Sequence, residues 1–181
     1  ETIRNYWIEQ AKQVEEHKKK AGNFVSFVLL EKPEWDKAAL QQILQDEWGI
    51  IDAEPESAEN DDENSLIINY QGAMLNIALM PGPIPGNEAT EAAVQQTSQH
   101  TGHLLVAVLG IGQSIIENGE MLVKLTAAAC KQPGALGDYA NGVVYPPDYY
   151  QHFAGMLKEN LFPIYNLVWF AFGNIGKQDI D

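Results

Sequence analysis

The amino-acid sequence predicts an α+β domain in which helices cover one face of a mixed, mostly antiparallel sheet. Short apolar runs of strand length alternate along the chain with longer segments whose apolar residues recur at helical spacing. Gln71-Gly72 stands between two strand-like runs and predicts a tight hairpin, which joins neighbouring strands antiparallel. The hairpin argues against a doubly wound parallel sheet and favours a layer of helices on a mostly antiparallel one.

Residues Glu1–Ala21 predict a polar helix that carries one apolar stripe. Lys18–Lys20 suit the negative end of the helix dipole, and Gly22 ends the helix. The stripe consists of Ile3, Tyr6, Trp7, Ile8, Ala11 and Val14. We therefore divide the chain into an N-terminal helical appendage, 1–22, and one α+β domain, 23–181. The stripe can dock on the body of the domain or join another chain in an oligomer.

The domain is expected to begin with a buried strand followed by a helix. Phe24–Leu30 is a continuous apolar run, which is typical of a central strand. Pro33 suits a first helical turn, and apolar residues at helical spacing continue to Trp48 before Gly49 ends the helix. Ile50–Ile51 is expected to open the second strand.

An acidic segment interrupts this second strand. Asp52–Glu63 holds seven acidic side chains and no basic one, which predicts a solvated loop. The strand resumes at Leu66–Tyr70, turns at Gln71-Gly72 and returns as Met74–Met80.

A stiff loop, Pro81–Gly86, then leads to a helix that Asn87 caps and that runs to about Gln99. His103–Leu109 predicts a buried strand, and Ser114–Lys131 predicts a helix. The middle of the domain thus has the order β-α-β-β-α-β, which is that of a ferredoxin-like core.

Further α-β pairs extend this core. Pro133-Gly134 ends the long helix, and a short hairpin follows over Gly137–Tyr145. Asp148–Leu161 predicts an aromatic-rich helix, and Ile164–Phe172 is expected to close the domain as a strand.

Composition excludes several classes of protein. The chain has 181 residues, 45% of them hydrophobic, and a net charge of −14. It is too apolar for a disordered chain, and too acidic to bind a nucleic-acid backbone or an anionic membrane. One cysteine allows neither an internal disulfide nor a four-cysteine zinc site.

Two motifs that could hold a ligand are incomplete. Gly110-Ile111-Gly112 follows a strand, but Ile115 stands where a dinucleotide fingerprint needs its third glycine. His100 and His103 are three residues apart with no acidic neighbour before Glu117, so we expect them to bond backbone or water. The sequence therefore predicts no cofactor and no metal site.

A catalytic constellation is also missing from the sequence. Cys130 lies in an apolar stretch with only Lys131 as a basic neighbour, which predicts a buried, inert thiol. No G-x-S-x-G motif places a serine beside a base. We expect a protein that is not an enzyme. The alternative is an enzyme whose reacting groups come from His100, His103, Cys130 and Tyr139.

Three features suit recognition of a protein partner. Acidic side chains raise the association rate with a basic partner. A proline-rich loop presents a surface at low entropic cost, and tyrosines are favoured at the hot spots of interfaces. The candidate partner-binding residues are Asp61, Asp62, Glu63, Pro83, Ile84, Pro85, Tyr149 and Tyr150.

Three segments carry a resemblance to known proteins: Ile77–Pro85, His103–Leu109 and Tyr139–Pro147. With the first strand and helix, the likeness covers about Phe24–Phe172. In these segments the chain resembles a bacterial domain-of-unknown-function family. The resemblance implies a bacterial origin, and it implies no activity, substrate or site residue.

These observations favour a non-enzymatic bacterial protein-binding domain. Its most specific form is a toxin-neutralising, immunity-type protein that binds a basic toxin or effector through its acidic surface. The alternative is a small-molecule-binding or sensory domain, which predicts a deep apolar cavity lined by Trp35, Trp48 or Trp169. Scarce cysteine favours a cytoplasmic location, and a start that looks trimmed, without an initiator Met, leaves the periplasm open.

Overall fold

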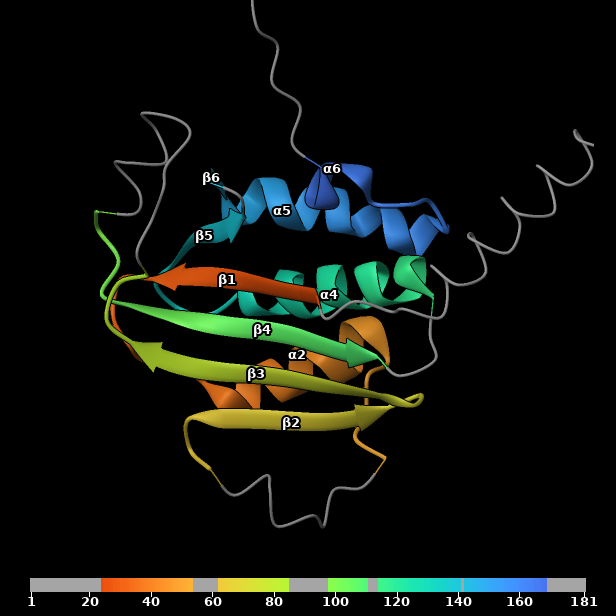
Figure 1. The fold of residues 1–181 in the computed structure, drawn as a ribbon, viewed down its shortest axis with the longest axis horizontal. Coiled ribbons are helices and arrows are strands. Elements are labelled where there is room, and N and C mark those ends of the chain that lie inside the picture. Colours follow the sequence, from red (N-terminus) through yellow and green to blue (C-terminus); the bar gives the residue numbers. More distant parts are fainter. Residues whose placement is uncertain (1–23, 54–61, 85–97, 111–113, 141, 169–181) are drawn as a thin grey trace, which may run out of the picture.

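The fold is described from a computed structural model, which covers residues 24–53, 62–84, 98–110, 114–140 and 142–168 (Figure 1). The elements, in chain order, are β1 (Phe24–Leu30), α2 (Lys37–Trp48), β2 (Ser65–Tyr70), β3 (Ala73–Pro81), β4 (Gly102–Gly110), α4 (Ile115–Ala129), β5 (Ala135–Ala140), β6 (Val143–Tyr145), α5 (Pro147–Ala154), the 3-10 helix η2 (Gly155–Glu159) and α6 (Ile164–Leu167). They confirm the predicted α+β class.

The six strands form one sheet in the order β2-β3-β4-β1-β5-β6, and every neighbouring pair is antiparallel. The structure does not confirm the ferredoxin-like core in detail. In a split βαβ core the two strands joined by the first helix run parallel with one strand between them. Here β1 and β2 run antiparallel, and both β4 and β3 lie between them.

Helices cover one face of the sheet, as predicted. Figure 1 shows α2 and α4 behind the strands, with α5 beside β5. Alternate side chains of the central strands, such as Val28, Leu104 and Val106, are fully buried in a core that they share with these helices. On the opposite face Val25 and Met74 stay exposed. The sheet therefore has one deeply buried face and one more accessible face.

The local signals for helix ends and turns are confirmed where the structure describes them, except that Pro33 lies in the loop before α2 and not in its first turn. Asp36 caps α2 by accepting a hydrogen bond from the Ala39 amide at 2.9 Å, and Gly49 ends the helix. Ser114 and Glu117 form a reciprocal capping box at the start of α4. The hairpin between β2 and β3 turns at Gln71-Gly72, where φ is positive at both residues.

Three predicted elements differ from the structure. Ile50–Ile51 lies in a loop. Residues Ile164–Leu167 form the short helix α6, not the strand predicted for Ile164–Phe172, because a short apolar run does not distinguish a strand from a buried helix. The aromatic-rich helix continues beyond Ala154 as a 3-10 helix to Glu159. No helix among the described residues is long and apolar enough to cross a membrane.

Several predicted features fall on residues that the structure does not describe. They are the helix Glu1–Ala21 with its boundary at residue 22, most of the helix Asn87–Gln99, most of the acidic segment, and residues 169–172 of the last predicted strand.

Candidate functional site

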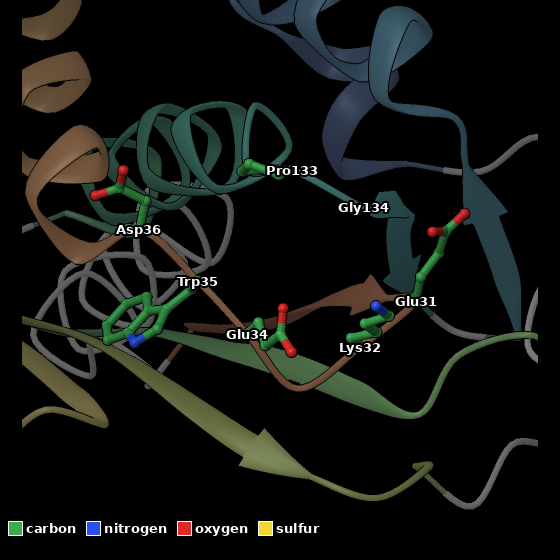
Figure 2. Close-up of a pocket in the computed structure, with 7 residues that line it drawn as sticks. All are labelled: Glu31, Lys32, Glu34, Trp35, Asp36, Pro133 and Gly134. Carbon is green, nitrogen blue, oxygen red and sulfur yellow. The ribbon is translucent and has the colours of Figure 1, made fainter.

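Two hollows lie at the two ends of β1. The first follows its C-terminal end and has a volume of about 360 Å³. Its lining, shown in Figure 2, consists of Glu31, Lys32, Glu34, Trp35, Asp36, Pro133 and Gly134. The charged side chains among these are all exposed, and the Trp35 indole turns away from Glu31 and Lys32 (Figure 2). This hollow is a polar depression in the surface.

The second hollow, which we call the Asp138 cavity, lies at the N-terminal end of β1 and has a volume of about 350 Å³. Residues of β1, α4, β5, α5 and α6 contribute to its walls. Exposed apolar side chains surround its mouth: Ile115, Ile116 and Phe162. Polar side chains that are buried lie deeper: Ser26, Asp138, Tyr150 and Asn166. The cavity is therefore mostly apolar, and these four side chains are its buried polar groups.

Asp138 is the most unusual of these groups. It lies on β5 opposite Val28 of β1, on the face covered by helices, and is 1% exposed. Burial raises the pKa of its carboxyl from 3.8 to about 7, although hydrogen bonds from the Ser26 hydroxyl and the Phe27 amide act in the opposite direction. At neutral pH this carboxyl is therefore divided between its neutral and its charged form.

Asp138 has no cationic partner among the described residues. No lysine, arginine or histidine of these residues forms an ion pair with it, and the Ser26 hydroxyl donates to its Oδ1. A buried carboxylate without a neutralising cation costs free energy that packing does not return. Groups of this kind concentrate at functional sites, so Asp138 marks the cavity as the candidate site.

Tyr150 and Cys130 are two of the titratable groups that lie close enough to Asp138 for its charge to shift their pKa. Burial raises the pKa of the Tyr150 phenol and of the Cys130 thiol, and the charge of Asp138 raises both further. Cys130 is buried, as predicted, and the raised pKa keeps it an inert thiol. Tyr150 and Cys130 are therefore neutral neighbours of Asp138, and neither is an activated nucleophile.

Asn166 on α6 contributes a second acceptor to the cavity. Its Nδ2 donates a hydrogen bond to the Tyr150 carbonyl oxygen at 2.8 Å, which fixes the orientation of the amide because an oxygen there could not donate. Its Oδ1 is buried and has no hydrogen-bond partner within the part of the chain that the structure describes. An unpaired buried acceptor is costly, so a donor is missing at this point of the wall.

The two histidines take structural roles. The Ile84 amide donates to Nε2 of His100 at 2.9 Å, and Nδ1 of His103 lies 3.1 Å from the Gly82 oxygen. Burial is the main reason why the pKa of His103 is lowered. These bonds to backbone, which the sequence predicts, tie the loop after β3 to the start of β4.

The alternative catalytic set is assembled only in part, because the rings of His100 and His103 lie 6.5 Å apart while Cys130 lies in the core. His103 lies on the face of the sheet opposite the core that contains Cys130, and the lining described for the Asp138 cavity contains neither Cys130 nor Tyr139. Among the described residues, no three His, Cys, Asp or Glu side chains are arranged to hold a metal ion.

The predicted acidic contacts are exposed where the structure describes them. Asp62 and Glu63 present their side chains to solvent, and their backbone oxygens accept hydrogen bonds from Lys37 Nζ at 2.9 Å and from Trp35 Nε1 at 3.0 Å. Glu63 also lines a shallow hollow of about 420 Å³. Asp61 lies outside the described residues.

The other predicted contacts have mixed outcomes. Pro83 is exposed and Ile84 is half-buried, while Pro85 lies outside the described residues. Tyr149 is exposed and stacks on Tyr145 with ring centroids 5.8 Å apart. The prediction for Tyr150 is wrong, because its side chain is 1% exposed and faces the Asp138 cavity instead of a partner.

Sequence reasoning missed Asp138, Ser26 and Asn166. A usable signal exists for Ser26, which alternates with Val28 and Leu30 at core-facing positions of a predicted strand. Of the tryptophans expected to line the cavity of a ligand-binding domain, Trp35 lines the polar hollow of Figure 2. Trp35 and Trp48 are absent from the described lining of the Asp138 cavity, and Trp169 lies outside the described residues.

No family model matches the chain, and no curated protein or solved structure matches it significantly. The resemblance to a bacterial domain-of-unknown-function family therefore stays a prediction. Function has to be argued from the site itself.

Proposed function

We propose that this chain is a small-molecule-binding domain whose ligand occupies the Asp138 cavity. One observation carries the proposal: a cavity of about 350 Å³ leads from an apolar mouth to a buried carboxyl without a cationic partner among the described residues. Cavities of this size, with apolar walls and a few convergent polar groups of shifted pKa, are the usual form of small-molecule sites.

The mouth supports the same function. Ile115, Ile116 and Phe162 remain exposed around it. A cluster of exposed apolar side chains is unfavourable in water and marks places where a ligand or partner binds. The apolar part of a ligand would cover these side chains while its polar end reaches Asp138.

The hollow in Figure 2 is a weaker candidate. Its charged side chains are exposed, so water solvates them at little cost. Asp36, one of its acidic residues, already serves as the N-cap of α2. Nothing in this hollow needs a ligand to complete it.

Binding of small fragments, detected by ligand-observed NMR, tests the proposal. Gly119 lines the cavity, and a Cβ there would lie 3.4 Å from Leu167 Cδ1, so Gly119→Leu fills the space. Ala38→Leu on the exposed side of α2 is the matched control. We expect fragments with an apolar ring to bind the natural chain and the control, and Gly119→Leu to abolish binding. Binding that Gly119→Leu leaves intact would contradict the proposal.

The protein-binding function predicted from the sequence remains a second proposal. One observation favours it: hydrogen bonds to the backbone of Asp62 and Glu63 hold their loop against α2 while both carboxylates face solvent. A loop that is already ordered presents its charges at low entropic cost. The toxin-neutralising role and the cytoplasmic location belong to this proposal.

Association kinetics test this second proposal. Asp62→Asn combined with Glu63→Gln is expected to slow association with a basic nuclease partner and to flatten its dependence on salt. Ala38→Leu serves again as the control on α2. An association rate that the double variant leaves unchanged at low salt removes the proposal.

A further inference from the structure

The buried polar atoms of the Asp138 cavity leave acceptors in excess. The Asp138 carboxyl accepts from Ser26 and has no cationic partner among the described residues. The Asn166 Oδ1 has no hydrogen-bond partner in the described ranges of the chain. Since the Nδ2 of Asn166 is held by the Tyr150 carbonyl at 2.8 Å, the amide cannot turn over to offer a donor instead. A ligand that binds while Asp138 is charged must therefore bring N–H or O–H donors.

The negative charge of Asp138 favours one kind of donor group in the ligand. A hydroxyl would satisfy one acceptor but leave the carboxylate without a counter-charge. An ammonium group supplies three N–H donors and a positive charge together. An anionic ligand would be repelled by Asp138 and by the whole chain, whose net charge of −14 instead attracts cations to its surface.

Resting on the ligand site proposed above, we propose that the cavity binds an amine with an apolar body, whose ammonium group lies between the Asp138 carboxylate and the Asn166 Oδ1. The apolar body covers Ile115, Ile116 and Phe162 at the mouth. Both ends of the ligand are needed, because the acceptors select the ammonium group and the apolar mouth excludes fully hydrated polyamines.

Three matched probes test the class of ligand: 2-phenylethylamine, 2-phenylethanol and 3-phenylpropanoate. They share a phenyl ring and differ in the group that would reach Asp138. We expect the amine to bind the full chain at least tenfold more tightly than the alcohol at pH 8, with the carboxylate weakest. Equal affinities for amine and alcohol, or a preference for the carboxylate, would overturn the amine proposal.

Two variants locate the ammonium group. Asp138→Asn keeps the shape of the side chain and removes its charge, and it relieves the burial of a carboxylate, so it should fold. We expect it to lower amine affinity at least tenfold and to leave alcohol affinity unchanged. Glu34→Gln, in the hollow of Figure 2, removes one exposed negative charge and is the matched control. An equal loss in both variants would indicate general attraction to an acidic surface and overturn the proposal.

The pH dependence of amine affinity is a further test of the pairing between the ammonium group and Asp138. The titratable groups that face Asp138 are Tyr145 on β6, Tyr150 on α5 and Cys130 after α4, and burial raises the pKa of all three. Asp138 is therefore the member of this group that ionises near neutrality. Amine affinity should fall about tenfold from pH 8 to pH 6 as the carboxylate is protonated, whereas alcohol affinity should not change. A flat amine profile counts against the pairing.

The outcomes separate the two proposals. If phenyl probes bind and Gly119→Leu blocks them, but amine and alcohol bind equally, the ligand site stands and the amine class fails. If none of the three probes binds the natural chain, both proposals fail together. If Asp138→Asn does not weaken the binding of spermidine, spermidine binds to the acidic surface and not in the cavity. If Asp138→Asn also leaves the binding of 2-phenylethylamine unchanged, the amine proposal is overturned.

Discussion

Acidic side chains are exposed to solvent at one end of β1 and buried at the other. Beyond its C-terminal end, Glu31, Glu34 and Asp36 line an open hollow and are exposed to water (Figure 2). At its N-terminal end a single carboxyl, Asp138, is 1% exposed in the cavity that Ser26 helps to line. Three solvated charges cost little, whereas one buried charge requires compensation. The burial of an acidic side chain is therefore a better indicator of a functional site than the number of acidic side chains.

The largest difference in stability between the two ends of β1 is expected from a substitution at Gly137, the neighbour of Asp138. Its φ is 144°, and a Cβ there would overlap the backbone oxygen of Tyr145. Gly137→Ala should therefore lower the free energy of unfolding by more than about 4 kcal/mol.

Gly134, which lines the hollow at the other end of β1, is the matched control. It also has a positive φ, of 74°, but the nearest atoms to a Cβ there all belong to Glu31, at ordinary distances of 3.6 to 3.9 Å. Gly134→Ala should cost about 1 kcal/mol. Urea denaturation measures both, and equal losses would contradict the packing described around Asp138.

The next effect is the dependence of stability on pH. The folded-state pKa of Asp138 is about 7, above the ordinary 3.8 of an unfolded chain, so the folded state holds the proton more tightly. The contribution of Asp138 to the free energy of unfolding is fully present below pH 4 and is lost as the pH rises through 7. The loss should approach roughly 4 kcal/mol by pH 8.

Asp138→Asn isolates that contribution. Denaturation at several pH values should show the natural chain losing stability relative to Asp138→Asn between pH 4 and pH 8. Two parallel stability curves would show that the Asp138 carboxyl is not desolvated in the folded state.

A smaller effect is expected from Ser26→Ala. The hydroxyl donates to Asp138 Oδ1 and so favours the charged form. Its removal should raise the pKa of Asp138 and cost about 2 kcal/mol at pH 8, where the carboxylate is charged. At pH 5 the cost should be nearer 1 kcal/mol. A cost that does not change with pH would mean that the hydroxyl does not stabilise the charged form.

The smallest effect is expected at the open hollow. Glu34→Gln removes an exposed charge that makes no ion pair among the described residues, so the unfolding free energy should change by less than about 0.5 kcal/mol. Thermal denaturation at pH 8 checks this. If Glu34→Gln changes the unfolding free energy as much as Asp138→Asn does, the two ends of β1 do not differ in how strongly they desolvate acidic side chains.

Local patterns in the sequence predicted most of the elements but not how they meet. The run Phe24–Leu30, the turn at Gln71-Gly72 and the cap at Ser114 each specify a local conformation. The position of β4 between β1 and β3 depends on pairings between distant segments, which no local pattern contains. The α+β class was therefore within reach of the sequence, and the strand order was not.

The candidate site was out of reach for the same reason. Ser26 and Asp138 are 112 residues apart and meet only because β5 pairs with β1. Tyr150 belongs to an aromatic-rich helix, and its neighbour Tyr149 is exposed while Tyr150 is buried. Composition alone does not tell which of two adjacent tyrosines faces the core.

An NMR titration of the Asp138 carboxyl carbon, with and without 2-phenylethylamine, tests directly whether this carboxyl is buried and binds an amine. The structure predicts an inflection near pH 7 in the free protein, displaced to lower pH when a bound ammonium group stabilises the carboxylate. An inflection near pH 4 that the amine leaves in place would show a solvated carboxyl, and it would contradict both the buried site and its proposed ligand.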